Sequence, residues 1–166
     1  MKMNPELKLA QENMQPGVIA LQGFLGDDKR DLSQIIDEDN QLVQSLETTH
    51  LKIATQMKFM REQGERGLGE FIDYGDHFQI RVDSVRGKMR CPFEDPGLIP
   101  KYNTTVINLT LNREVTYTDM NIHFIEIHGF YQGEGSLFRI GPDDLVQVLE
   151  IEGAPASPQR FDIPIK

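Results

Sequence analysis

The 166-residue chain contains no tryptophan and only one cysteine, Cys91. One cysteine cannot form a disulfide within the chain, so a reducing cytosol is the simplest setting. No apolar run reaches the roughly 20 residues that a membrane-spanning helix needs, and the N-terminal stretch MKMNPELKLAQENMQPG lacks the apolar core of a secretory signal. These absences predict a soluble cytoplasmic protein that does not act at a membrane.

Basic side chains are also scarce: 17 lysines and arginines face 26 acidic residues, which gives a net charge of -9. Nucleic-acid binding needs a basic surface to neutralise phosphates, so we do not expect nucleic acid as a partner. The length suits one domain with a core that needs no disulfide. We expect that domain over residues 17–152, after a flexible arm at 1–16 and before an extended tail at 153–166, whose alternating end could pair with a second copy in a homo-oligomer.

The spacing of apolar residues changes along the chain. Residues 17–24 (GVIALQGF) form a short apolar stretch that predicts a strand. Helical spacing follows over 32–46 and 53–60, where we interpret the methionines as core filler, because Met adapts to irregular gaps. Strand-like alternation begins near residue 78 and continues in a predicted hairpin over 102–117. The pattern predicts an α+β fold, in which a helical N-terminal half packs on a small, mainly antiparallel sheet.

A further buried helix is predicted at residues 118–128. Thr118 is a good N-cap, and Gly129 stands where a left-handed residue ends helices. Asp119, His123 and Glu126 then fall on one stripe, and together they offer the carboxylate and imidazole donors that divalent zinc, manganese or iron accepts. His128 would lie on nearly the opposite side of an α-helix. The first hypothesis is therefore a divalent-metal or small-ligand site near 118–139.

Two other interpretations of the same stripe remain open. Asp119 or Glu126 could orient His123 as a general base, so the sequence does not decide whether the protein is an enzyme. The stripe could also be a capped helix with an Asp119–His123 pair and a solvated Glu126. In that case the protein is a non-catalytic structural or interaction protein that forms a homo-oligomer.

The segment after this helix, QGEGSLFR, is rich in glycine. Backbone N–H groups at Gly133, Gly135 and Ser136, together with the Arg139 guanidinium, could bind a small anionic ligand. An ordinary loop is the alternative, because glycine and serine commonly serve turns. Cys91 follows several basic residues that could activate it as a nucleophile, although a lone cysteine is more often a small buried apolar residue.

Four segments of the chain resemble members of a family of short, uncharacterised bacterial proteins described as hypothetical cytosolic proteins. They are GFLGDDKR (23–30), RGKMRCPF (86–93), TDMNIH (118–123) and HGFYQGEGSLFR (128–139). The likeness runs from about residue 17 to residue 149. The resemblance implies a cytosolic bacterial setting, and it carries over no activity and no catalytic residue.

Overall fold

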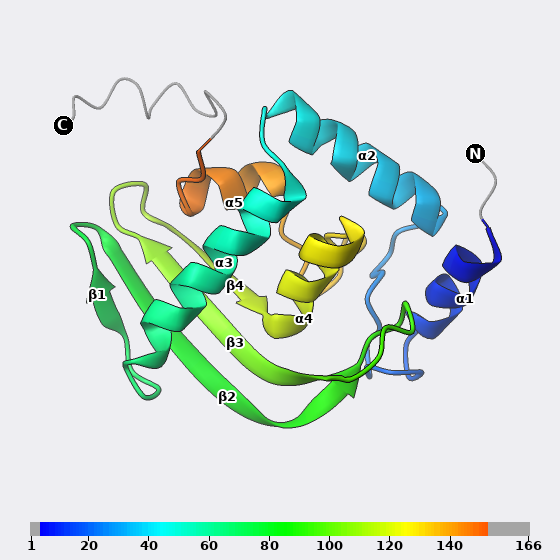
Figure 1. The fold of residues 1–166 in the computed structure, drawn as a ribbon, viewed down its shortest axis with the longest axis horizontal. Helices are drawn as coiled ribbons and strands as arrows, with labels where there is room; N and C mark the ends of the chain where they lie inside the picture. The colour runs from blue at the N-terminus through cyan, green and yellow to red at the C-terminus, as the bar shows by residue number, and fades with distance from the viewer. Residues whose placement is uncertain (1–3, 153–166) are drawn as a thin grey trace.

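The computed structural model describes residues 4–152 and shows a mixed α+β fold, as the sequence predicts (Figure 1). The elements in chain order are α1 (Pro5–Asn13), α2 (Leu32–Ser45), α3 (His50–Glu65), β1 (Ile72–Tyr74), β2 (Phe78–Arg90), β3 (Leu98–Asn108), β4 (Arg113–Thr118), α4 (Asp119–His123), the π-helical turn η1 (Phe124–His128) and α5 (Pro142–Val148). Within these residues no helix has both the length and the apolar character to cross a bilayer. The predicted tail at 153–166 lies outside the described residues.

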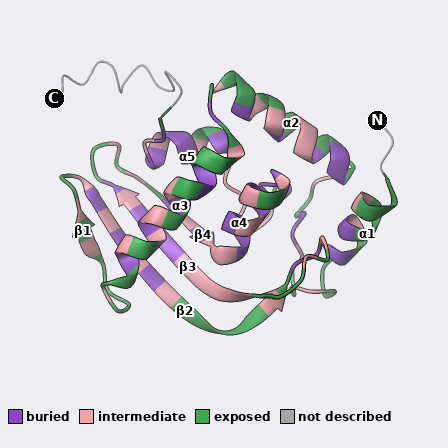
Figure 2. Ribbon diagram, in the orientation of Figure 1, coloured by how far each residue is buried: buried purple, intermediate pink, exposed green. Residues whose placement is uncertain are grey.

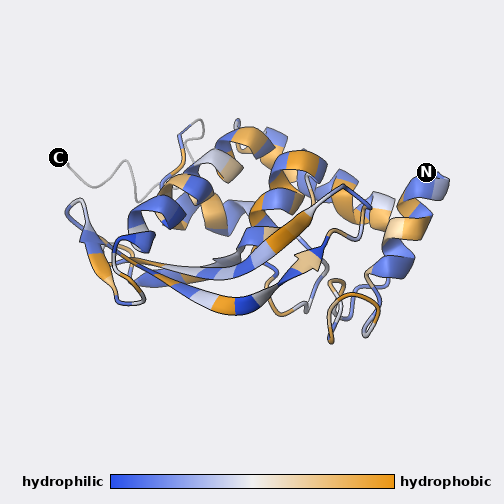
Figure 3. Cartoon of the chain, turned by 60° about the horizontal axis from the view of Figure 1, so that its bottom comes forward, coloured by the Kyte–Doolittle hydropathy of each residue, from blue (hydrophilic) through white to orange (hydrophobic). Residues whose placement is uncertain are grey.

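The four strands form one antiparallel sheet in the order β1-β2-β3-β4. Its centre is the long β2–β3 hairpin, whose register runs from Phe78 opposite Asn108 to Arg90 opposite Leu98. The register shifts between Val85 and Lys88, and Figure 1 shows the hairpin curving there toward α1. Helices cover one face of the sheet, as the turned view in Figure 3 shows. Because of its curvature, the far end of the β2–β3 hairpin comes close to α1.

Two clusters of buried apolar side chains form the core. Figure 2 marks the buried residues along the ribbon. The larger one joins α3, α5 and η1 to the sheet. The smaller one joins α1, the start of α2 and the segment after η1 to the far end of the hairpin, and it includes Cys91, Met120, Phe124 and Phe130. The segment at 118–128 therefore contributes side chains to both clusters, as expected for an enclosed helix.

The N-terminal part of the chain differs from the sequence-based expectation in two ways. Residues 17–24 form successive turns instead of a strand, because Gly17 and Gly23 have positive φ angles of 86° and 71°, which an extended strand does not contain. Residues 5–13, expected within a flexible arm, form α1. Its Ala10 and the following Met14 are buried in the smaller core cluster, so this helix belongs to the packed fold.

Gly64 allows α3 to lie directly on β2. A Cβ atom at this position would meet the Cγ2 atoms of Ile80 and Val82 at 2.6 and 2.9 Å. Alanine is the better helix former by about 1 kcal/mol, whereas overpacking a core typically costs about 1–3 kcal/mol. The two Cγ2 methyl groups belong to the buried, branched side chains of Ile80 and Val82, which cannot easily move away. The cost of the clash should therefore exceed the gain in helix propensity, and we expect Gly64→Ala to lower the free energy of unfolding by about 1 kcal/mol.

Urea denaturation followed by far-ultraviolet circular dichroism measures this change, since the chain has no tryptophan to report on unfolding. Glu62→Ala, at an exposed position of the same helix, is the control and should change stability by less than about 0.5 kcal/mol. A Gly64→Ala variant as stable as the wild type would show that α3 and β2 do not pack this closely.

Candidate metal centre

The loop between β2 and β3 carries two donor side chains, Cys91 and Asp95. The loop turns tightly, because the Glu94 N–H donates to the Cys91 carbonyl oxygen at 2.9 Å. Asn13 of α1 holds it from outside, as its side-chain amide donates to the Pro92 carbonyl and to a Glu94 carboxylate oxygen, each at 3.0 Å. The N-terminal helix therefore fixes the loop on which both donors lie.

The other two donors, His123 and His128, lie five residues apart on α4 and η1. On a regular α-helix such residues point about 140° apart, since each turn contains 3.6 residues. The π-helical turn takes one more residue per hydrogen-bonded ring, and this brings the two imidazoles to the same side of the segment. Their ring centroids are 5.7 Å apart. The expectation that His128 lies opposite His123 is therefore corrected by this turn.

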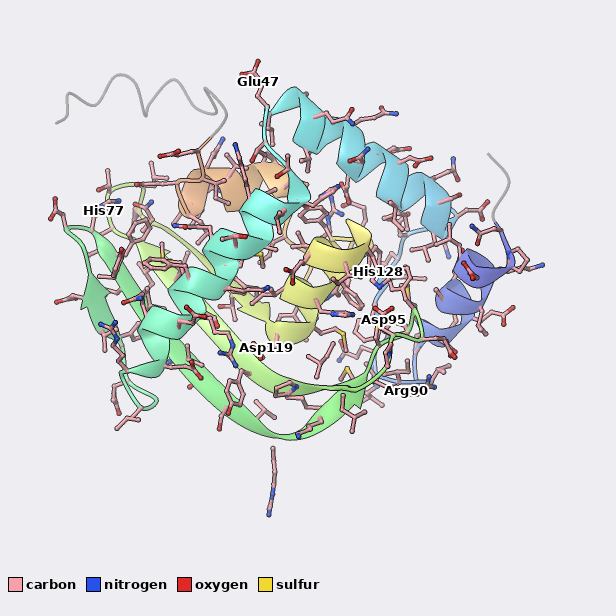
Figure 4. All side chains as sticks on the ribbon, in the orientation of Figure 1. Glu47, His77, Arg90, Asp95, Asp119 and His128 are labelled. Carbon is pink, nitrogen blue, oxygen red and sulfur yellow. The ribbon has the colours of Figure 1, made fainter. Side chains whose placement is uncertain are left out.

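Both imidazoles meet the same carboxylate oxygen. The Nε2 atoms of His123 and His128 lie 2.7 and 2.6 Å from Oδ2 of Asp95, and the Cys91 thiol donates to this oxygen at 3.5 Å. Figure 4 shows Asp95 and His128 next to each other, where the loop meets the yellow helix. The ring of Phe93 stacks on that of His128 with centroids 3.8 Å apart. One donor atom from each of the four residues lies within 4.8 Å of the other three.

The surroundings set the charges of this group. Burial raises the pKa of the Cys91 thiol to about 11, so the thiol is protonated near neutral pH. Burial also lowers the pKa of His128 below its ordinary value, although Asp95 opposes this shift. Burial would raise the pKa of Asp95, but the hydrogen bonds from both histidines outweigh it and lower the pKa. The group thus combines an ionised carboxylate with a neutral imidazole and a protonated thiol.

Each residue of the sequence-predicted triad has a different partner. Asp119 accepts two hydrogen bonds from Arg61, at 2.7 and 2.9 Å, and Glu126 pairs with Lys58 at 2.8 Å. His123 instead contacts Asp95. Asp119, His123 and Glu126 line one pocket together with Lys58 and Arg61 of α3, whose cations neutralise both carboxylates. Among the described residues their donor atoms do not form a group close enough to share one ion.

The predicted anion-binding loop also uses its donors internally. Gly133 N–H donates to the Phe24 carbonyl at 3.0 Å, and Glu134 N–H donates to a carboxylate oxygen of Asp28 at 3.0 Å. A Cβ at Gly133 would meet the Leu25 carbonyl at 2.3 Å, so the glycine permits close contact between two loops. The anion nearest to this loop is therefore a side chain of the protein itself.

Two further members of that predicted site, Ser136 and Arg139, are engaged as well. Ser136 Oγ donates to Oε1 of Gln132 at 2.6 Å. Arg139 forms two hydrogen bonds with Asp39, at 2.5 and 3.0 Å, and both side chains are largely buried. The Arg139 guanidinium thus neutralises a buried carboxylate on α2 instead of facing a ligand.

Comparison with models of known protein families finds no match, and no curated protein or solved structure matches the chain significantly. The interpretation of the site therefore depends on its own geometry. The sequence does contain a signal for this group of four donors: Cys91 and Asp95 lie four residues apart, and His123 and His128 lie five residues apart. Paired ligands on two separate segments are typical of zinc sites, but nothing in the sequence brings these two pairs together.

A thiol with a pKa near 11 is a poor nucleophile. At pH 8 its thiolate fraction is roughly a hundredfold lower than that of a cysteine with an ordinary pKa near 9. We expect iodoacetamide to alkylate Cys91 at least about a hundredfold more slowly in the folded, chelator-treated protein than in urea, as measured by mass spectrometry. Equal rates in both conditions would support the alternative in which Cys91 is an activated nucleophile.

The buried Asp39–Arg139 pair should matter for stability. Removing one partner of such a pair typically costs about 3–5 kcal/mol, because the other charge stays buried without compensation. We therefore expect Asp39→Asn to lower the free energy of unfolding by about 3 kcal/mol in urea denaturation. Asp83→Asn is the matched control, since the Arg81–Asp83 pair is exposed and contributes less than about 1 kcal/mol. Similar losses in both variants would contradict this assignment.

Proposed function

We propose that this protein binds one zinc ion through Cys91, Asp95, His123 and His128. The observation that carries the proposal is the convergence of four donor atoms, from two segments far apart in the sequence, to within 4.8 Å of one another. A thiolate, imidazoles and a carboxylate are the donors that zinc accepts, whereas calcium and magnesium prefer oxygen ligands alone.

All four donor atoms lie within 4.8 Å of one another, which is of the same order as the spacing in a tetrahedral zinc shell. Zinc bonds of about 2.0–2.3 Å place neighbouring donors about 3.3–3.5 Å apart. Oδ2 of Asp95 is nearer than this to both Nε2 atoms, so it would have to retreat by about 0.7 Å on metal binding. Each Nε2 must also give up its proton so that its lone pair faces the ion, and the Cys91 thiol must ionise.

The proposed role of the ion is structural. Four protein ligands complete a tetrahedral shell and leave no position for a substrate or a reactive water molecule. The ion would join the β2–β3 loop to α4 and η1, and so hold the far end of the hairpin against the helices. Because the side chains of Asp95, His123 and His128 are 27, 24 and 18% exposed, an ion can reach the site from solvent. At this site the proposal favours the non-catalytic alternative over an enzyme.

Neighbouring side chains support the proposal by orienting the ligands. Phe93 stacks on His128 and restricts the rotation of its ring. Asn13 holds the backbone of the ligand loop through Pro92 and Glu94. Such outer contacts commonly fix the ligands of metal sites, and their loss weakens metal binding.

Cytoplasmic location and self-association are further parts of the proposal. The single cysteine and the resemblance to short bacterial proteins support a reducing cytosolic setting, in which a thiolate ligand to zinc persists. A homo-oligomer stays a prediction, because the tail expected to mediate it lies outside the described residues.

Untagged protein purified without chelator should contain about one zinc ion per chain in elemental analysis. His123→Ala, His128→Ala and Cys91→Ala should each lose the bound metal, because three ligands hold zinc much more weakly than four. Cobalt substitution gives an independent result. The wild type should show a thiolate-to-cobalt charge-transfer band that Cys91→Ala lacks.

Asp119→Asn and Glu126→Gln are the controls for these variants. Their carboxylates pair with Arg61 and Lys58, so both variants should keep the full zinc content. The reverse pattern, in which these two variants lose the metal and Cys91→Ala keeps it, would instead assign the ion to the triad suggested by the sequence. Wild-type protein that takes up no zinc after dialysis against it would remove the proposal entirely.

A further inference from the structure

A cavity of about 340 Å³ lies at the curved end of the β2–β3 hairpin, apart from the four proposed metal ligands. Val85, Met89 and Ile99 of the hairpin form one wall, and the turns at residues 20–24 and the loop at 132–138 form the others. This volume lies within the range of about 300–1,000 Å³ that is usual for small-molecule sites. The cavity is therefore large enough for a small organic ligand.

The cavity opens on the face of the sheet away from α3. Lys101 and Asn103, which line it, alternate along β3 with Tyr102, and the Tyr102 ring lies against Arg61 of α3. Neighbouring residues of a strand point to opposite faces of the sheet. For the described part of the chain, Figure 3 shows connecting segments, but no helix, on the side of the sheet opposite the helices.

Large apolar side chains surround the opening. Leu21 is 86% exposed, Leu137 is 73% exposed and Val85 is 46% exposed, and all three line the cavity. They come from three separate parts of the chain. Single exposed apolar residues are common, but a group that gathers around a concave, apolar space is typical of a binding site.

The charge of the cavity contrasts with that of the protein. The chain has 26 acidic residues, yet among the residues that the structure describes no aspartate or glutamate lines this cavity, and Lys101 is its one charged side chain. Within residues 4–152, Lys101 takes part in no ion pair. An unpaired ammonium group beside apolar walls favours a ligand that carries one negative charge.

Gln132 supplies a second, buried donor. Its side chain lines the cavity, the residue is only 3% exposed, and its φ angle of 71° is rare for a residue other than glycine. Ser136 holds Oε1 of Gln132, and Arg139 donates to the Gln132 carbonyl at 2.9 Å. Within the described part of the chain no acceptor is paired with the amide nitrogen Nε2, which leaves it available to a ligand. Gln132 therefore offers a side-chain N–H donor beside the apolar lining.

We propose that this cavity binds a small apolar carboxylate. Its hydrocarbon part would lie against Leu21, Val85 and Leu137, and its carboxylate would pair with the Lys101 ammonium, with the Gln132 amide as a second donor. The proposal uses none of the four metal ligands.

Isothermal titration with octanoate tests the proposal, and 1-octanol serves as the uncharged probe of similar length. Wild-type protein should bind one octanoate saturably. Lys101→Met, which keeps the apolar stem of the side chain, should weaken octanoate binding about tenfold or more and leave 1-octanol binding unchanged. Lys52→Met, which removes an exposed lysine from α3, is the matched control and should have no effect on either probe.

One further variant and a second condition test whether the probes bind in this cavity and whether the zinc ion affects them. Leu137→Asp places a carboxylate at the opening without disturbing the core, because Leu137 is exposed, and it should weaken the binding of both probes. Zinc-loaded wild-type protein should bind octanoate saturably, and a second titration after chelator treatment separates this result from the outcome for the metal site. The absence of saturable binding, or equal losses in Lys101→Met and Lys52→Met, would overturn the proposal. A dimer that Leu137→Asp converts to monomer in light scattering, without octanoate binding, would assign this face to a second copy and also overturn it.

Discussion

The hydrogen bonds that Asp95 accepts from His123 and His128 connect the two halves of the tertiary structure. Asp95 lies in the loop that ends the long hairpin, and the histidines lie on the helical segment between the two core clusters. One carboxylate oxygen can meet both rings only because η1 is a π-helical turn. The curvature of the hairpin, the position of α1 against the loop and the orientation of Phe93 are all consistent with this single meeting point.

The acidic composition imposes a second constraint on the interior. Buried carboxylates need partners, and several of the chain's few cations serve this purpose. Arg30 pairs with Asp28, Arg61 with Asp119 and Arg139 with Asp39, and each of these carboxylates is largely buried. Side chains that looked like candidates for ligand binding are for this reason part of the scaffold. Lys101, which has no such partner among the described residues and lines an apolar cavity, differs from them.

Local signals predicted several elements of the fold correctly. Thr118 caps α4 through the Asn121 N–H, and Gly129 adopts a left-handed conformation at the end of η1. The alternation near residue 78 and the hairpin that follows it also formed as expected. These features depend on residues close together in the chain, and hydrogen bonds and steric preferences of the local backbone largely decide them.

The sequence by itself thus determined the α+β class, the antiparallel hairpin, the limits of the helical segment at 118–128 and the presence there of side-chain types that can ligate a metal. Only the tertiary structure decided which donors meet. It placed Asp119 and Glu126 against cations of α3, and brought Cys91 and Asp95 to His123 and His128. Periodicity reports which face of one element a residue occupies, whereas a site built from two segments depends on how those segments pack. The π-helical turn η1 contains one extra residue, which moved His128 to the same side of the segment as His123. No local pattern in the sequence predicted this turn.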